Sequence, residues 1–574
     1  MSNTGGEANT LGAVFRSTVT RFPDRPALKF PAENGFQTLT YRQYEERVRR
    51  FASALLKWGL QKGDRLAIQA ENCGEWMTVD WACQTLGITL VPIYTTLPAD
   101  QTEFILTDSQ AKIVVVGTAE LAQKITCTTV KMLKGSEGSL SDEANQTEPM
   151  SSEQWNASID GVCESDLATL IYTSGTTGNP KGVMLPQRAP TWLCRQITEN
   201  FPIDQNDTFF SFLPLSHVFG RLGDNWLPVS CGACVGHMKS LASMANDMST
   251  VQPTIFLSVP RFLEALKERI EDGVKKQPPL RQKLFHAFVS QGLSKSHGKF
   301  APMYPILKAI VGKKLKARVG GKLRFFVSGG AALPKHVGDF YEAIDFPIVQ
   351  GYGLTETTAA TTLNPYNDRR HWTVGKPIGD CEVKIATDGE ILIRGISIMD
   401  GYFNLPEATA EAIDSEGWFH TGDIGEWEDG YLKITDRKKD LLVLANGKNI
   451  APQVIENRMR ESALIQEMVL FGDGSEYVYG LVIPNWENVA AALPHLNLNP
   501  SDVAALAQND EVKKLIKQTI DGINKTLAPF EVVKRHAVVD AKFSVETGEL
   551  TPSLKVKRKV IKERYADVLA TLAR

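Results

Sequence analysis

The sequence predicts an α/β protein with a large N-terminal domain and a small C-terminal α+β domain. In the first 130 residues, helical and strand-like patterns alternate: apolar side chains recur at helical spacing over 41–56, and short apolar runs stand at 65–69 and 112–116. Such alternation is typical of mostly parallel sheets covered by helices. A length of 574 residues exceeds one ordinary domain. Further on, strand-like runs at 468–471 and 477–483 predict a hairpin in the small domain.

Composition and charge exclude several functional classes. The chain holds 63 Lys and Arg against 66 Asp and Glu, so no attraction to nucleic acid is expected. We find no apolar run long enough to span a bilayer, and the polar start lacks a signal-peptide core. The eight scattered cysteines fit a reducing cytoplasm, where we expect the protein. Cys231 and Cys234 lack the second ligand pair that zinc requires, so we interpret them as buried thiols.

A loop rich in hydroxyls and glycines lies between two predicted buried strands, 167–172 and 183–185. Glycines let the backbone approach an anion, and N–H groups, hydroxyls and one lysine can donate to phosphate oxygens. A Walker A loop is excluded, because Pro180 stands in place of its second glycine and Gly182 follows Lys181. The candidate phosphate-binding residues are Thr173, Ser174, Gly175, Thr176, Thr177, Gly178 and Lys181.

Two glycine turns follow predicted strands, at 323–334 and 349–357. Such turns at strand ends of an α/β sheet are common ligand sites. A dinucleotide fingerprint is excluded, because the second turn has Glu356 where the last glycine would stand. Tyr352 can lie flat against a purine, Thr355 can donate to a phosphate, and Glu356 can hold Mg²⁺. The candidate nucleotide-binding residues of the two turns are Gly329, Gly330, Ala331, Gly351, Tyr352, Gly353 and Thr355.

These stretches resemble the motifs of adenylate-forming enzymes, the superfamily of acyl-CoA synthetases, firefly-type luciferases and peptide-synthetase adenylation domains. The segment 172–182 is similar to the family signature, and the two glycine turns are similar to its adenine- and phosphate-binding motifs. The resemblance covers nearly the whole chain. Gly-Glu-Leu-Thr-Pro at 548–552, followed by a basic run, is most similar to long-chain fatty acyl-CoA synthetases.

The resemblance implies roles for residues that the patterns alone leave open. Aligned on the final motif, Lys555 takes the place of the catalytic lysine, with Lys557 as the alternative register. Asp423 corresponds to a family aspartate that accepts hydrogen bonds from both ribose hydroxyls. Arg437 corresponds to a family residue that reaches the ribose. His217, which the surrounding apolar run puts at a strand end facing a cleft, gains a catalytic positioning role in place of the ordinary core role of such a histidine.

The resemblance also implies the domain plan. Residues 1–436 form the large nucleotide- and acyl-binding domain, 437–440 the hinge with Lys439 at its centre, and 441–574 the small mobile domain that carries the catalytic lysine. Gly447 lies along the path of coenzyme A, where it leaves room for the pantetheine arm. In some bacterial long-chain relatives a tryptophan four residues after the motif histidine gates the acyl tunnel. Arg221 stands there in this chain, which puts such a gate in doubt.

The implied function is ATP-dependent activation of a fatty acid, expected to be long-chain, to acyl-AMP with Mg²⁺ on Glu356, followed by transfer to coenzyme A. Two alternatives stay open: an acyl carrier protein as acceptor, and a non-catalytic acyl-nucleotide-binding protein. The non-catalytic protein is disfavoured, because the chain holds all four of the residues Lys181, Glu356, Asp423 and Lys555. Chain length and oligomeric state are not fixed by the sequence.

A basic segment at 295–324 carries lysines and arginines among apolar residues. We favour its interpretation as a solvated helix face. The alternative is a patch that meets anionic lipid headgroups, in peripheral contact with a membrane, or the phosphates of coenzyme A.

Overall fold

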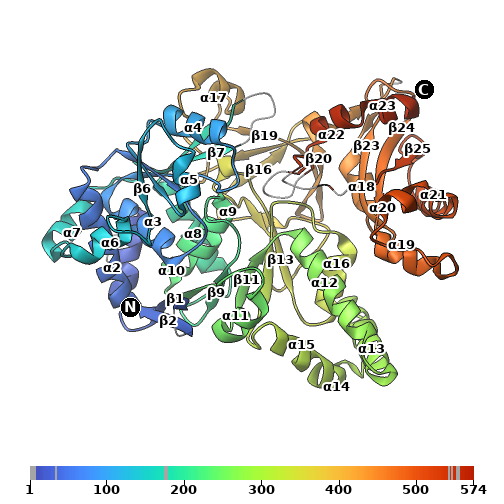
Figure 1. The fold of residues 1–574 in the computed structure, drawn as a ribbon, viewed down its shortest axis with the longest axis horizontal. Coiled ribbons are helices and arrows are strands. Elements are labelled where there is room, and N and C mark those ends of the chain that lie inside the picture. The colour runs from blue at the N-terminus through green and yellow to red at the C-terminus, as the bar shows by residue number, and fades with distance from the viewer. Residues whose placement is uncertain are drawn as a thin grey trace. The chain divides into compact units, whose positions relative to one another are not determined.

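The computed structural model describes residues 8–32, 35–173, 179–445, 447–540, 543, 547–550 and 556–573. The chain divides into two compact units (Figure 1). Unit 1 comprises residues 1–333, 337–384 and 392–421, and unit 2 comprises 334–336, 385–391 and 422–574. Unit 2 thus takes in residues before 437, and the hinge at 437–440 stays a prediction.

One sheet of unit 1 has seven strands in the order β18-β8-β7-β4-β3-β5-β6. Neighbouring strands from β7 to β6 are parallel, whereas β8 is antiparallel to β7 and β18 is antiparallel to β8. The strands are β3 (Arg65–Gln69), β4 (Thr89–Pro92), β5 (Ile113–Val116), β6 (Thr129–Met132), β7 (Leu167–Thr173), β8 (Lys181–Pro186) and β18 (Gly401–Tyr402). The predicted strands at 65–69, 112–116 and 167–172 are therefore confirmed, as is the parallel sheet.

A second sheet of unit 1 has nine strands in the order β15-β14-β13-β12-β11-β9-β10-β1-β2. Its strands from β13 to β1 are parallel, and antiparallel strands close both edges. They are β1 (Pro26–Ala32), β2 (Gly35–Thr40), β9 (Thr208–Ser211), β10 (Cys234–His237), β11 (Ile255–Ser258), β12 (Phe325–Ser328), β13 (Ile348–Tyr352), β14 (Thr362–Leu363) and β15 (Lys376–Pro377).

Helix α2 (Tyr41–Lys57) shows how the local sequence builds unit 1. The side chains of Tyr44, Val48, Phe51 and Leu55 recur at three- and four-residue spacing and are buried. Thr40 begins the helix with a capping box, because its hydroxyl accepts from the Gln43 N–H and the Gln43 side chain accepts from the Thr40 N–H. The helix predicted at 41–56 is confirmed.

The remaining helices before residue 421 cover the two sheets or connect their strands. They are α1 (Leu11–Arg21), α3 (Gly74–Leu86), α4 (Ala99–Asp108), α5 (Ala119–Gln123), α6 (Leu140–Gln146), α7 (Ser152–Asp160), α8 (Arg188–Asn200), α9 (Val218–Arg221), the π-helical η1 (Leu222–Trp226), α10 (Leu227–Cys231), α11 (Met244–Val251), α12 (Pro260–Lys275), α13 (Pro279–Ser296), α14 (Tyr304–Leu307), the π-helical η2 (Lys308–Gly312), α15 (Lys313–Arg318), α16 (Lys335–Ala343), the short η3 (Thr355–Thr357) and α17 (Pro406–Ala412).

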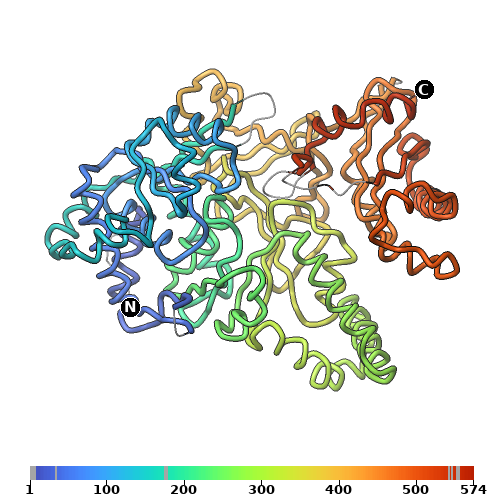
Figure 2. The backbone as a smooth tube through the Cα atoms, viewed as in Figure 1, coloured from blue at the N-terminus to red at the C-terminus, as the bar shows by residue number. Residues whose placement is uncertain are grey.

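Unit 2 holds a three-stranded sheet, in which β23 (Ile465–Phe471) and β24 (Val478–Pro484) form the predicted hairpin. Strand β25 (Val533–Val538) adds to β24 in parallel, and helices cover the sheet as Figure 2 shows in orange and red. The helices are α18 (Pro452–Met459), α19 (Trp486–Ala492), η5 (Pro494–Leu496), α20 (Val503–Gln508), α21 (Asp510–Asn524), α22 (Arg558–Arg564) and α23 (Ala566–Leu572). The small α+β domain is confirmed.

Two smaller sheets complete the chain. A four-stranded sheet has the order β16-β17-β19-β20, and a two-stranded sheet pairs β21 with β22. Their bounds are β16 (Glu382–Ile385), β17 (Glu390–Arg394), β19 (Phe419–Glu428), β20 (Tyr431–Arg437), β21 (Leu442–Val443) and β22 (Asn449–Ile450), with the short helix η4 (Lys438–Asp440) between β20 and β21.

Cys231 and Cys234 are buried free thiols, as interpreted from the sequence. Within the described ranges, no group of three or more His, Cys, Asp or Glu side chains could hold a metal ion. Over the same ranges, no helix is both long enough and apolar enough to cross a membrane.

Candidate active site

The predicted phosphate loop joins strands β7 and β8. These strands form an antiparallel hairpin whose last register pair is Thr173 with Lys181, so the loop is closed at its base by two of the predicted residues. The Thr173 hydroxyl lies 3.5 Å from the Lys181 carbonyl oxygen. Ser174, Gly175, Thr176, Thr177 and Gly178 lie outside the described residues.

Tyr402 connects Lys181 with Glu356. Its hydroxyl donates a hydrogen bond of 2.9 Å to Glu356 Oε1, and the ammonium nitrogen of Lys181 lies 4.9 Å from the centre of its ring. Burial, and then the Glu356 carboxylate beside it, raise the pKa of Tyr402, so this hydroxyl stays a donor at neutral pH. A cation, a carboxylate and a phenol from three separate segments thus meet in one place.

The turn after β13 holds Glu356 in a fixed position. A Cβ on Gly353 would lie 2.4 Å from the carbonyl oxygen of Ala359, so only glycine lets the chain fold back so closely. The Glu356 carbonyl accepts from the Met399 N–H, and Thr358 and Ala359 follow with φ of 58° and 80°. Non-glycine residues in this left-handed region store strain, which is common at functional sites. Tyr352 is buried beneath this turn, with 8% of its surface exposed.

His217 caps helix α9 and does not end a strand. Strand β9 ends at Ser211, and a turn follows in which the His217 N–H donates to the Pro214 carbonyl. The predicted strand-end position is wrong, because Pro214 lacks the N–H that a ladder needs and the strand ends before the histidine. The ring Nδ1 accepts from the Phe219 N–H at 3.1 Å, so a neutral ring carries its proton on Nε2.

The turn that follows β12 lies beside His217. A Cβ on Gly329 would come within 3.2 Å of the ring of Phe219, two residues after the histidine. The predicted residues Gly329, Gly330 and Ala331 therefore share one region of unit 1 with His217.

Arg221 lies in the core of unit 1. Its side chain is fully buried and donates from Nε to Asp80 Oδ2 at 2.8 Å, from Nη2 to Asp80 Oδ1 at 2.5 Å and from Nη1 to Thr169 Oγ1 at 2.6 Å. Its guanidinium carbon lies 4.5 Å from the centre of the Trp226 ring. The doubt about a tunnel gate at this position stays a prediction.

The predicted ribose residues of unit 2 meet across strands β19 and β20. Asp423 is register partner to Arg437, and Arg437 Nε lies 3.1 Å from Asp423 Oδ1. Only 5% of the Asp423 side chain is exposed, against 35% for Arg437, so the aspartate is held by its partner. Burial, and then the charge of Arg437, lower the pKa of Lys439 in η4.

The last predicted motif is described only at its edges. Lys555 lies outside the described residues, whereas Leu550 and Val556 pair as an antiparallel bridge and the Lys557 N–H donates to Glu549 O at 2.7 Å. The Lys557 side chain is exposed. Gly447 has φ of 78°, and no atom of the described residues beyond its chain neighbours lies within 4 Å of where its Cβ would stand. Its backbone conformation thus favours glycine, and its predicted place along the coenzyme A path stays a prediction.

Residues 15–403 match the AMP-binding enzyme family, and residues 439–572 match the AMP-binding enzyme C-terminal domain. This chain belongs to the AMP-binding enzyme family. It is 31% identical to a long-chain-fatty-acid–CoA ligase of Mycobacterium bovis, over 98% of this chain and 97% of the relative. It is also 31% identical to fatty acyl-CoA synthetase A of Dictyostelium discoideum, over 94% of this chain and 86% of the relative.

Solved structures support the same fold. ATP-bound MatB from Rhodopseudomonas palustris is similar with a TM-score of 0.74 at 24% identity, over 97% of this chain and 99% of the other. A Mycobacterium tuberculosis fatty acyl CoA synthetase gives a TM-score of 0.64 at 23% identity, over 98% and 99%. The predicted fold class is confirmed by these likenesses.

Sequence reasoning missed one residue of this AMP-binding enzyme's candidate site. Tyr402 stands in a strand of two residues, too short for a periodic signal, and it reaches the site through pairing of β18 with β8. A single tyrosine after a glycine carries no mark of its partner 46 residues away.

Proposed function

We propose that this protein is an ATP-dependent ligase that converts a long-chain fatty acid to its coenzyme A thioester, releasing AMP and pyrophosphate. The observation that carries the proposal is the cluster of Lys181, Tyr402 and Glu356 in a chain of the AMP-binding enzyme family. The names of the two relatives support the fatty acid as substrate and coenzyme A as acceptor.

The reaction needs activation because a carboxylate has no good leaving group. A carboxylate oxygen attacks the α-phosphorus of ATP, pyrophosphate leaves, and the mixed anhydride acyl-AMP forms. The sulfur of coenzyme A then attacks the acyl carbonyl, AMP leaves, and the thiol proton passes to solvent. Two anions meet in the first step, so catalysis is mainly positioning and charge stabilisation.

In unit 1, Lys181 and the loop from Thr173 to Gly178 would bind phosphate oxygens, and Thr355 would donate to the α-phosphate. The Glu356 carboxylate is a hard oxygen donor, which fits Mg²⁺, an ion that usually keeps several waters and also binds substrate phosphates. When bound, Mg²⁺ would neutralise phosphate charge. Tyr402 orients the carboxylate through its hydrogen bond. The turns at Gly329–Ala331 and Gly351–Gly353 would line the adenine site, with Tyr352 against the purine.

In unit 2, we propose that Asp423 accepts the ribose hydroxyls and that Arg437 reaches the ribose. Lys555 would stabilise the charge that develops as acyl-AMP forms. His217, in unit 1, would position the carboxylate and the thiol path. We further propose that the enzyme works in the cytoplasm and touches membranes peripherally, because its substrate is poorly soluble in water.

The test is pyrophosphate and AMP release with saturated acids of increasing chain length, with and without coenzyme A. Continuous turnover that requires coenzyme A and peaks at long chains is expected. A single burst of pyrophosphate that coenzyme A does not change would instead indicate a carrier-protein acceptor. Absence of any ATP turnover would indicate a binding protein.

Tyr402→Phe should slow acyl-adenylate formation about 10-fold, because Glu356 loses a hydrogen bond of the charged kind, worth about 1.5–3 kcal/mol, while the ring under Lys181 remains. Pyrophosphate exchange into ATP measures the loss. Tyr477→Phe is the matched control, since that hydroxyl donates to the Leu572 carbonyl in unit 2. Equal exchange rates for the two variants would show that the Tyr402 hydroxyl has no role in acyl-adenylate formation.

Lys439→Pro should slow thioester formation and spare adenylate formation. Proline fixes φ at the proposed hinge and so opposes the rotation between the two half-reactions. Single-turnover rates of each half-reaction measure the effect, with Lys438→Ala as control for charge in the same short helix. A loss confined to adenylate formation would contradict a hinge at this residue.

A further inference from the structure

A long segment, all of it in unit 1 except residues 334–336, lacks acidic residues altogether. Between Asp272 and Asp339 the sequence contains no Asp or Glu, yet it contains 14 Lys and Arg. The whole chain has a net charge of −3, so this segment stands out against an otherwise acidic protein. Such a concentration of one sign creates a local field that attracts an anionic partner.

The segment includes α13 and the helical run in which α14, η2 and α15 follow one another end to end; this run packs on α13 through α14 and η2. Helices α13, α14 and α15 lie at the lower edge of unit 1 in Figure 1. Their inner side is firmly packed: Tyr304, Leu307 and Leu315 are buried, and the Tyr304 ring stacks on Phe288 with 5.6 Å between centroids. The outward side of these helices is therefore held in a defined orientation.

Large apolar side chains are exposed on the outward side of α14 and η2 and in the residues that lead into α14. We call this surface the α14–α15 face; its apolar members and their exposed fractions are Phe300 (88%), Met303 (49%), Ile306 (54%) and Ile310 (47%). The spacing from 303 to 310 puts three of them on one side of the helical run. Because apolar side chains gathered on a soluble surface usually mark an interaction site, their burial by a partner is favourable.

Lysines that form no ion pair within the described residues border these apolar side chains. Lys308 and Lys316 both pair with Asp345 at 2.8 Å. In contrast, Lys299, Lys313 and Lys314 make no ion pair with any described residue, and Lys313 and Lys314 are exposed beside Ile310. Their charges are thus available to an external anion, and we count them as the basic members of the α14–α15 face.

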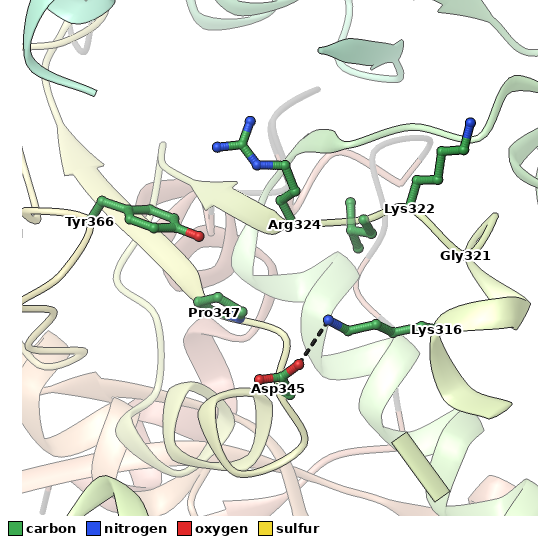
Figure 3. Close-up of a pocket in the computed structure, with 8 residues that line it drawn as sticks. Lys316, Gly321, Lys322, Arg324, Asp345, Pro347 and Tyr366 are labelled. Carbon is green, nitrogen blue, oxygen red and sulfur yellow. Dashed lines mark ion pairs between the residues drawn. The ribbon is translucent and has the colours of Figure 1, made fainter. Parts of the chain in front are cut away.

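A basic groove continues from this face. One part, of about 510 Å³, is lined by Pro305, Lys308, Gly312 and Lys313 among others, and an adjoining part of about 340 Å³ is lined by Lys316, Lys322 and Arg324. Figure 3 shows Lys316 turned toward Asp345, while Lys322 and Arg324 point away from that ion pair. Asp345 lines both parts as well, and Arg324 pairs with Asp207 at 2.6 Å. Lys313 and Lys322 are therefore the lining cations that pair with no described carboxylate, and a phosphate group that enters the groove beside the apolar side chains would meet these two lysines.

We infer that the α14–α15 face docks onto an anionic phospholipid bilayer, with the four apolar side chains entering the headgroup boundary and Lys299, Lys313 and Lys314 meeting lipid phosphates. A second copy of the chain would present the same positive charge and be repelled. A nucleic acid would match the charge but leave the apolar side chains exposed. This inference rests on the proposed membrane contact and is independent of the ligase reaction.

Sedimentation of the full-length protein with vesicles tests the inference. We expect binding to vesicles of 70% phosphatidylcholine and 30% phosphatidylglycerol to be on the order of 100-fold tighter than to pure phosphatidylcholine, and weak in 0.5 M NaCl. Lys313→Glu with Lys314→Glu should weaken binding about 30-fold or more, since each lysine near such a surface contributes about 1 kcal/mol. Ile306→Ser with Ile310→Ser should weaken it about 10-fold through lost insertion.

Matched variants in other places separate these effects from general ones. Lys514→Glu with Lys525→Glu makes the same charge change on exposed residues of unit 2, and Leu56→Ser with Val568→Ser removes two other exposed apolar side chains. Both should bind vesicles as the unchanged protein does. All variants should keep their melting temperature and their ATP turnover with a short, water-soluble acid.

Three results would overturn the inference. One is equal binding of the unchanged protein to anionic and neutral vesicles. Another is an equal loss of binding in the test and matched variants. The third is a change of oligomeric state in the Ile306 and Ile310 variant without a change in vesicle binding, which would indicate a second copy as the occupant. Because vesicle binding and acyl-CoA formation are measured separately, failure of one leaves the other intact.

Discussion

Replacing Lys555 with alanine is expected to slow acyl-adenylate formation about 100- to 1,000-fold and to leave thioester formation from supplied acyl-adenylate nearly unchanged. The first half-reaction joins a carboxylate to a phosphate, so negative charge accumulates where the lysine would act. The second half-reaction expels AMP from a neutral carbonyl centre and needs no such cation. Pyrophosphate exchange measures the first step, and coenzyme A consumption with acyl-AMP measures the second.

Lys557→Ala is the matched control for this prediction. Lys557 is exposed and caps helix α22, and its described hydrogen bond to Glu549 uses the backbone N–H, which alanine retains. Its rates should stay near those of the unchanged enzyme. If Lys557→Ala shows the split and Lys555→Ala does not, the motif register is shifted by two residues. Equal losses in both half-reactions for Lys555→Ala would refute its role altogether.

The fold was predictable because its elements follow local rules. The spacing of apolar residues in α2 and the apolar run of β3 each predict which side chains are buried. The alternation of helices and strands along the chain predicts a parallel sheet. The phosphate hairpin was also local, since Thr173 and Lys181 are register partners at its base. The turn before Glu356 was predictable from its glycines. The structure gives the reason at Gly353, because the chain returns so close to this residue at Ala359 that a Cβ would not fit.

What sequence reasoning missed depends on contacts between distant segments. Tyr402 reaches Glu356 only because a short strand pairs with β8, and no periodic pattern marks a strand of two residues. His217 was assigned to a strand end because an apolar run does not reveal that the strand ends before Pro214. Arg221 could not be recognised as buried, because an arginine is usually exposed and its partner Asp80 lies 141 residues earlier.

The buried pair of Asp80 and Arg221 gives the second large prediction. Both side chains have 0% exposure. Asp80→Leu should lower the free energy of unfolding by about 3–5 kcal/mol, because it strands a buried guanidinium whose remaining side-chain hydrogen bond is to Thr169. Urea unfolding followed by tryptophan fluorescence measures this directly, since the Trp226 indole N–H donates to Asp80 Oδ2 at 3.0 Å.

The double variant Asp80→Leu with Arg221→Met distinguishes a stranded charge from a simple loss of packing. Removing both charges avoids desolvating either one alone, so the double variant should be more stable than Asp80→Leu. Asp160→Ala is the surface control, because it breaks the ion pair with Arg16. The Arg16 side chain is 32% exposed and that of Asp160 is 63% exposed, so the free energy of unfolding should fall by at most about 1 kcal/mol. If instead the loss of unfolding free energy in the double variant equals the sum of the losses in Asp80→Leu and Arg221→Met alone, the pair contributes through packing.

The π-helical segment η1 directly follows Arg221, and helix α9 begins after His217. The same variants should therefore also alter how the histidine is positioned.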